Sequence, residues 1–266
     1  METESVKLVY FSPTRTTKAV AQGIARGINP GTMELIDITR PDARKQPLQV
    51  LGNELLVVAV PVYMGRVPAL LNEWLNAIQA HNTPTVCVVV YGNRVYDDAL
   101  LELKNILMER GCIPIACAAF IGEHSFSDPE TPTAQGRPDE KDLNHAELLG
   151  QEIRKKLQSI SSVSQLSDVH VPGTYPYGGV TKLWIVDFIV VSDECSQCGI
   201  CAGKCPVGAV DAENSRLIDT EKCITCCACI KYCPQNARSM KPGPVKDASV
   251  RLHTLYSQRK EPECFI

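Results

Sequence analysis

The sequence predicts an α/β fold: a doubly wound parallel sheet of five strands in the order 2-1-3-4-5, followed by a small α+β domain. Strand-like apolar runs alternate with helix-like segments over residues 1–160. One run, Leu55–Val60, is apolar without a break, as in strands of sheets that helices cover on both faces. The small domain is indicated by eight cysteines, which form two runs of equal spacing within residues 190–240.

The elements of the first domain follow one another in a regular order. Short apolar or alternating runs predict five strands, at Val6–Phe11, Met33–Ile38, Leu55–Val60, Thr85–Tyr91 and Cys112–Ile121. Helical spacing predicts helices at Thr16–Ile28, Pro68–Ile78, Asp97–Glu109 and Lys141–Leu157. In such a sheet the ligand site lies beyond the carboxyl ends of strands one and three, and strand four contributes a loop.

Composition and charge argue against several classes of function. The chain has 266 residues and a net charge of −3, which predicts neither a nucleic-acid nor an anionic membrane partner. No apolar run reaches the roughly 18 residues of a membrane span. The first residues lack the charged and apolar regions of a signal peptide. With 13 cysteines, we therefore expect a cytoplasmic protein in a reducing compartment, from an anaerobic or microaerobic host.

The loop after the first strand carries four hydroxyls in six residues at the start of a helix. Its members are Ser12, Pro13, Thr14, Arg15, Thr16 and Thr17. Backbone N–H groups and the helix dipole attract a phosphate there, and hydroxyls complete its cage. The alternative is a simple helix cap, for which one hydroxyl suffices. The glycine patterns of the Walker and Rossmann phosphate loops are both absent.

The loops after strands three, four and five carry the other candidate ligand residues. These are Pro61, Val62, Tyr63, Met64, Gly65, Arg66, Tyr91, Gly92, Asn93, Arg94, Tyr96, His124 and Ser125. Flat aromatic rings suit a flat tricyclic ring. Taken singly, each tyrosine is interpreted as a residue that packs at the surface, and His124 as a hydrogen-bonded loop residue. Together, loops at one end of the sheet predict a flavin pocket, with His124 as a proton donor or a contact at the flavin edge.

The cysteine runs both read C-x2-C-x2-C-x3-C-P. The first comprises Cys195, Cys198, Cys201 and Cys205, and the second Cys223, Cys226, Cys229 and Cys233. This spacing is that of iron–sulfur proteins, whereas structural zinc sites use separated C-x2-C pairs and disulfides suit small secreted domains. The two runs also form an internal repeat. Cys227 is an extra thiol, which we interpret as a small packed side chain; the alternative is a spare cluster ligand.

These motifs resemble two known families. Residues 5–160 resemble flavodoxins, because the loop at 12–17 looks like their FMN phosphate loop, and residues 190–240 resemble bacterial 2[4Fe-4S] ferredoxins. The fused arrangement is similar to flavodoxin–ferredoxin fusions of the EFR1 type, whose Tyr-Gly-Asn-Arg and Gly-Arg-Pro-Asp segments look like residues 91–94 and 136–139. Residues 161–189 would then be a linker and docking segment, and residues 241–266 a C-terminal tail.

The resemblance implies FMN and two [4Fe-4S] clusters as cofactors. In bacterial ferredoxins the fourth cysteine of each run ligates the other run's cluster. The implied ligand sets are Cys195, Cys198, Cys201 and Cys233 for one cluster, and Cys205, Cys223, Cys226 and Cys229 for the other.

The implied activity is electron transfer between one-electron and two-electron carriers, with redox proteins such as a ferredoxin-like donor or acceptor as partners. One alternative is an FMN-dependent reductase of a small organic substrate, in which residues 123–139 form a lid; another is a redox sensor. Arg15, Arg66 and Arg94 lie in the flavin loops. We expect their charge to ease full reduction of FMN, although each would have no effect if it pointed into solvent.

Overall fold

The computed structural model describes residues 5–162, 165, 167–179 and 184–266. The prediction that the first residues lack the features of a signal peptide includes residues 1–4, which lie outside the described range. The predicted linker and docking segment, 161–189, also falls in part outside the described residues, at 163–164, 166 and 180–183. No helix of the described part is long and apolar enough to cross a membrane.

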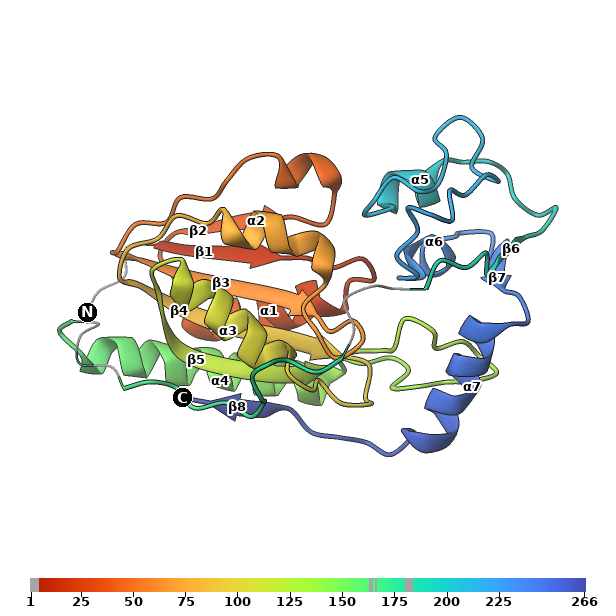
Figure 1. Ribbon diagram of the computed structural model, residues 1–266. Coiled ribbons are helices and arrows are strands. Elements are labelled where there is room, and N and C mark those ends of the chain that lie inside the picture. Colours follow the sequence, from red (N-terminus) through yellow and green to blue (C-terminus); the bar gives the residue numbers. More distant parts are fainter. Residues whose placement is uncertain (1–4, 163–164, 166, 180–183) are drawn as a thin grey trace.

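The first domain is built on a parallel sheet in the predicted order. Its strands are β1 (Ser5–Tyr10), β2 (Met33–Asp37), β3 (Glu54–Pro61), β4 (Thr83–Tyr91) and β5 (Cys112–Ile121). They are hydrogen-bonded in the order β2-β1-β3-β4-β5, and every one of these neighbouring pairs is parallel. The doubly wound fold is therefore confirmed, and the carboxyl ends of the strands meet at one edge (Figure 1).

Helices cover both faces of this sheet. α1 (Thr16–Ile28) and α4 (Glu140–Ser159) pack on one face, and η2 (Ala69–Leu71), α2 (Asn72–Asn76) and α3 (Ala99–Glu109) pack on the other. A short 3-10 turn, η1 (Pro41–Arg44), follows β2. The helix predicted at Pro68–Ile78 is shorter than expected, because the Leu71 N–H bonds to Pro68 O at 2.8 Å and opens it with a tight turn.

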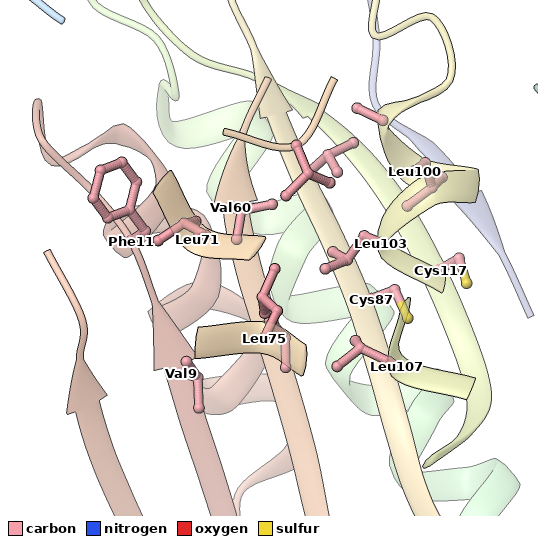
Figure 2. Packing of buried hydrophobic residues seen from close by; sticks show 14 of the residues in the cluster. Val9, Phe11, Val60, Leu71, Leu75, Cys87, Leu100, Leu103, Leu107 and Cys117 are labelled. Atoms are coloured by element: carbon pink, nitrogen blue, oxygen red, sulfur yellow. The ribbon is translucent and has the colours of Figure 1, made fainter. Parts of the chain in front are cut away.

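Alternate residues of the central strands feed two separate cores. In β3, Leu56, Val58 and Val60 face α2 and α3, whereas Leu55 and Val57 face α1 and α4; all are fully buried. Figure 2 shows the first core, with Val60 from the sheet beside Leu71 and Leu103 from the helices. Burial on both faces explains why this strand is apolar without a break.

The second domain is an internal repeat with an offset of 28 residues. β6 (Ile189–Val191) pairs antiparallel with β7 (Arg238–Met240), and α5 (Ile200–Lys204) corresponds to α6 (Ala228–Lys231). Left-handed residues recur at the same offset: Gln197 and Thr225 (φ 53° and 52°), Gly199 and Cys227 (72° and 57°), and Gly208 and Asn236 (65° and 50°). The two halves therefore follow the same backbone path.

The C-terminal segment folds back onto the first domain and is not a free tail. α7 (Pro244–Leu255) leads to β8 (Glu263–Phe265), which pairs antiparallel with β5 as a sixth strand of the sheet. Tyr96 donates a hydrogen bond to Glu263 at 2.8 Å, and the Asn93 amide donates to Tyr256 O at 2.6 Å. A three-residue strand is too short to leave a periodic signal, which is why the sequence did not reveal it.

Candidate functional site

A cavity of about 800 Å³ lies at the carboxyl edge of the sheet. Twelve of the residues predicted from sequence line it: Pro13, Thr14, Thr16, Thr17, Pro61, Val62, Tyr63, Met64, Tyr91, Gly92, His124 and Ser125. The loops after β1, β3, β4 and β5 thus meet around one space, as the parallel topology requires.

The start of α1 offers unsatisfied groups to this cavity. The Thr17 hydroxyl is fully buried and has no hydrogen-bond partner among the described residues. No side chain caps the helix in the usual way, although Ser12 Oγ accepts from Lys18 N–H at 3.0 Å. A buried hydroxyl without a partner is costly, so it indicates a missing acceptor or donor. A phosphate at this helix N-terminus would satisfy Thr17, and the loop therefore fits the phosphate of FMN.

The loop after β3 places one tyrosine between the cavity and the second domain. Tyr63 and Arg66 exchange backbone hydrogen bonds of 3.0 Å across a turn in which Met64 and Gly65 have positive φ angles. A Cβ on Gly65 would lie 2.4 Å from Asp97 Oδ2, so the turn requires glycine. Burial raises the pKa of the Tyr63 hydroxyl well above its usual value, and nearby Cys226 adds to the effect.

The three arginines predicted to act on the flavin do not line the cavity. Arg66 forms an ion pair with Glu102 at 2.7 Å, and its guanidinium lies 4.9 Å from the ring centre of Tyr177. Arg94 is paired with Asp97, and Arg15 stacks on a ring of the second domain. A neighbouring carboxylate cancels most of an arginine's field, so the expectation that Arg66 eases flavin reduction is not supported by its position.

The other predicted residues outside the cavity have structural roles. Asn93 binds the backbone of the C-terminal segment through its amide, and Tyr96 packs against Tyr91 at 5.4 Å between ring centres. Ser12 accepts a hydrogen bond within the first turn of α1, and Gly65 forms the turn described above. Sequence position at the correct sheet edge did not distinguish these residues from those that face the cavity.

His124 lines the cavity as a neutral ring. Its Nδ1 accepts a hydrogen bond from Phe126 N–H at 3.0 Å, so the ring proton resides on Nε2. Burial lowers the His124 pKa to about 4, and the charges of Lys231 and Arg94 act in the same direction. A Cβ on Gly92 would lie 2.1 Å from the His124 ring, so glycine is needed where the imidazole packs. His124 can therefore donate one hydrogen bond without carrying charge.

Sequence reasoning missed seven residues that line the cavity. They are Val90, Gly122, Glu123, Phe126, Trp184, Ile224 and Thr225. Trp184 precedes the second domain and is 41% exposed. An aromatic residue in the predicted docking segment was the available signal for it. Nothing local distinguishes Ile224 and Thr225, because they reach the cavity only through packing of the two domains.

The second domain gathers one predicted set of cluster ligands around an apolar space. Cys205, Cys223, Cys226 and Cys229 line it together, so a cysteine of the first run joins three of the second, and the extra thiol of Cys227 lines the same space. Burial raises the pKa of Cys229 to about 12 and also raises that of Cys226 well above its usual value. Buried thiols of this kind become thiolates only beside strong positive charge, which iron supplies. The donor set therefore fits a [4Fe-4S] cluster.

Backbone hydrogen bonds to sulfur repeat in both halves. Ala209 N–H donates to Cys205 Sγ at 3.2 Å, and Ala237 N–H donates to Cys233 Sγ at 3.3 Å. Such bonds tune iron–sulfur clusters. Within the described residues no three His, Cys, Asp or Glu side chains converge as they would on a single metal ion. Each thiolate of a four-iron cluster binds its own iron, so its ligands need not converge in that way.

The two domains are joined by specific contacts beside the cavity. The Lys231 ammonium pairs with Glu123 and donates to Ser127 O at 2.6 Å. Arg44 donates to Pro206 O at 2.8 Å. Thr225, next to the cysteine at 226, forms part of the cavity wall. The second cysteine set is therefore held directly behind the wall of the candidate flavin site.

Comparisons with known proteins agree with this division. Residues 188–234 match the family described as 4Fe-4S dicluster domain. Ferredoxin-2 of Chlorobaculum tepidum is 37% identical over 51 residues, which covers 16% of this chain and 82% of that protein. A flavodoxin from the domain Archaea shares 19% identity over 58% of this chain and 99% of its own, with a TM-score of 0.40. Flavodoxin 1 of Bacillus cereus shares 16% identity over 59% and 99%, with a TM-score of 0.43.

The strand order of the first domain, rather than similarity at this level, defines its fold as flavodoxin-like. The ferredoxin match lies above 30% identity and spans most of the relative. Through residues 188–234 the chain belongs to the 4Fe-4S dicluster ferredoxin family, and it joins this domain to an N-terminal domain of flavodoxin-like fold.

Proposed function

We propose that this protein is an electron-transfer flavoprotein, which passes electrons between two [4Fe-4S] clusters and FMN. Clusters carry one electron at a time and FMN carries one or two, so the chain converts between one-electron and two-electron carriers. The single observation that supports this best is the shared wall. Ile224 and Thr225 line the candidate flavin cavity, and the next residue, Cys226, belongs to the buried cysteine set.

The residues of the first domain suit the binding of FMN in that cavity. The Thr17 hydroxyl and the N-terminus of α1 would hold its phosphate. Tyr63 and Tyr91 offer aromatic faces for the ring system, and the neutral His124 offers an N–H donor. None of the charged arginines of the loops is needed for this placement.

The two cysteine sets would occupy different positions along the path. Each set has a buried cysteine at corresponding positions, Cys201 and Cys229, but Cys226 is buried whereas its counterpart Cys198 is exposed. The set of Cys205, Cys223, Cys226 and Cys229 would thus hold the cluster nearer to FMN. The other set, Cys195, Cys198, Cys201 and Cys233, would hold the cluster that exchanges electrons with a partner.

A groove between the domains suits an acidic redox partner. Four cations line it, Arg15, Lys18, Arg40 and Lys204, together with one acid, Asp37. None of these cations forms an ion pair with a carboxylate of the described residues. Tyr232 also lines this groove and is adjacent in sequence to Cys233, a cysteine of the outer set. Unpaired positive charge in a chain of net charge −3 attracts an acidic partner such as a ferredoxin-like protein.

Anaerobic preparation followed by rapid mixing tests the proposal. We expect about eight irons and about one FMN per chain, from two four-iron clusters and one nucleotide site. After mixing with a reduced bacterial ferredoxin, the cluster absorbance should change first and the flavin absorbance should follow. Zinc in place of iron, failure to retain FMN, or a flavin that stays oxidised beside reduced clusters would each contradict the proposal.

A second function, reduction of a small organic molecule by FMN, is favoured by a separate observation. A groove of about 1,020 Å³ adjoins the flavin cavity and shares seven lining residues with it: Val62, Met64, Tyr91, Gly92, His124, Phe126 and Trp184. A pure electron carrier has no need of such a space. Two residues of the expected lid over 123–139, His124 and Phe126, line this groove, and the loop is anchored by Lys231 and Lys246.

A further inference from the structure

The groove beside the flavin cavity has a wall that the C-terminal segment supplies. The residues of α7 that line it are Ala248, Arg251 and Leu252, and Tyr256 follows them. The opposite side comes from the loops after β3 and β4. The shared lining residues make the groove continuous with the cavity. A small molecule in the groove would therefore lie against the edge of whatever occupies the flavin site.

This wall is held in place by hydrogen bonds to the loop after β5. Ser249 Oγ donates to Phe126 O at 2.6 Å, and the His253 ring donates from Nδ1 to Pro132 O at 2.6 Å. Lys246 pairs with Asp128 at 2.7 Å. Contacts on successive turns of one helix face fix its orientation. The groove is thus preformed, and a ligand need not order its walls on binding.

The chemistry of the lining selects a planar anion. Tyr91, Phe126, Trp184 and Tyr256 contribute aromatic side chains. Two arginines also line the groove, and no aspartate or glutamate of the described residues does so.

Only one of the two arginines is free to bind a ligand. Arg94 is already paired with Asp97. Arg251 is exposed, and its side chain makes no hydrogen bond or ion pair with another described residue. A guanidinium can bind a carboxylate through two parallel hydrogen bonds. The neutral His124, at the junction with the cavity, adds a hydrogen-bond donor without cancelling the positive charge.

We infer that this groove binds a small aromatic carboxylate, with its ring among the aromatic side chains and its acid group on Arg251. The inference rests on the proposed function, since the ligand would be positioned against FMN. It names a substrate class for the second function and assigns to α7 a role in forming the binding site.

Calorimetry on the FMN-loaded protein under anaerobic conditions tests this inference with two matched probes. 2-Naphthoate and 2-naphthamide have the same ring and similar size, but only the first is charged. We expect the acid to bind about tenfold more tightly than the amide, because a hydrogen bond to a charged group is lost with the amide. Arg251→Gln should remove this preference and leave the affinity for the amide unchanged.

Two further variants distinguish binding in the groove from a non-specific attraction of the anionic probe to exposed arginines. Arg154 on α4 is also exposed and without a partner among the described residues, so Arg154→Gln should keep the preference for the acid. Trp184→Ala should weaken both probes. Equal affinities for the two probes, a preference that survives Arg251→Gln, or release of FMN by the acid would overturn the inference.

Failure of the inference can be distinguished from failure of the proposed function. Iron and FMN contents and the reduction of FMN by ferredoxin are measured on the same preparation. If these are as expected while neither probe binds, only the inference is wrong. If FMN is not retained, the proposed function itself fails.

Discussion

The two cluster-binding loops, residues 195–205 and 223–233, share one backbone path but have different surroundings. Their left-handed residues coincide at an offset of 28, and each half has an alanine N–H that donates to a cysteine sulfur. Three of the four corresponding cysteine pairs are buried to the same degree. The remaining pair differs, because Cys198 in the first loop is exposed and Cys226 in the second is buried. Local sequence fixes the loop shape, and contact with the other domain determines how each loop is covered.

The two loops also differ in how they meet the flavodoxin-like domain. Thr225 in the second loop is part of the flavin cavity wall, whereas its counterpart in the first loop, Gln197, is not. The α6 residue Lys231 pairs with Glu123 of the flavodoxin-like domain, and its counterpart Gly203 meets that domain only through its carbonyl, which accepts from Arg40 at 2.6 Å. We therefore expect an inner cluster beside FMN and an outer cluster that faces a partner.

The largest expected effect separates inner from outer ligands. Cys226→Ala and Cys198→Ala should each lower the iron content from about eight to about four per chain. In Cys226→Ala, flavin reduction should be slow with both reduced ferredoxin and reduced methyl viologen, because the inner step is lost. In Cys198→Ala, it should be slow with ferredoxin alone, since a small donor reaches the inner cluster. Rapid-mixing spectroscopy measures the rate of flavin reduction with each donor. Identical rates in the two variants would contradict the assignment of an inner and an outer cluster.

A smaller effect concerns the partner at the outer end. Lys204→Glu reverses one charge of the unpaired basic groove and should slow reduction by an acidic ferredoxin roughly tenfold at low ionic strength. The difference should shrink as salt screens the charges. Arg154→Glu makes the same change in net charge on α4, away from the groove, and should leave the rate near that of the wild type. An equal loss in both variants would show that net charge alone matters.

A cluster can be called the inner one only if FMN occupies the cavity, and a substitution of Thr17 tests whether FMN binds there. Thr17→Val should lower FMN affinity about tenfold, because a hydrogen bond to a charged phosphate is lost. The free energy of unfolding without FMN should not fall, since the buried Thr17 hydroxyl has no partner to lose.

A matched threonine should show the opposite pattern. Thr85 is also fully buried, but its hydroxyl donates to Thr83 O at 3.0 Å. Thr85→Val should therefore lower the free energy of unfolding and leave FMN affinity unchanged. Fluorescence titration with FMN and denaturant unfolding of both variants provide the comparison. If Thr17→Val retains full FMN affinity, the phosphate does not lie at this hydroxyl.

The sequence predicted the parts that depend on local pattern. Continuous apolar strands gave the strand order, and the hydroxyl-rich loop led to the cavity that Thr17 and Tyr63 line. The parts it did not predict depend on distant pairings. Arg66 meets Glu102 across 36 residues, and β8 joins β5 after more than a hundred. Ile224 lines the flavin cavity only because the domains dock, and no periodicity in its own segment indicates this.

The smallest expected effect concerns the extra thiol of the second loop. Cys227 takes the left-handed place of Gly199, is 2% exposed, and donates from Sγ to Thr225 O at 3.8 Å. Cys227 also lines the space that the second cysteine set surrounds, so its position fits a spare ligand as well as a packed thiol. For a packed thiol, Cys227→Ala should keep about eight irons per chain, whereas a ligand role would lower the count.

Comparison of Cys227→Ala with Cys227→Gly measures the cost of holding a side chain in the left-handed backbone conformation at this position. A side chain at φ 57° is strained, so the glycine variant should unfold with a free energy about 1 kcal/mol higher than the alanine variant. Both variants lack the buried thiol, so packing changes nearly cancel between them. An alanine variant that is the more stable would mean that the second loop relaxes away from the path of the first, and the two halves would then differ in shape as well as in burial.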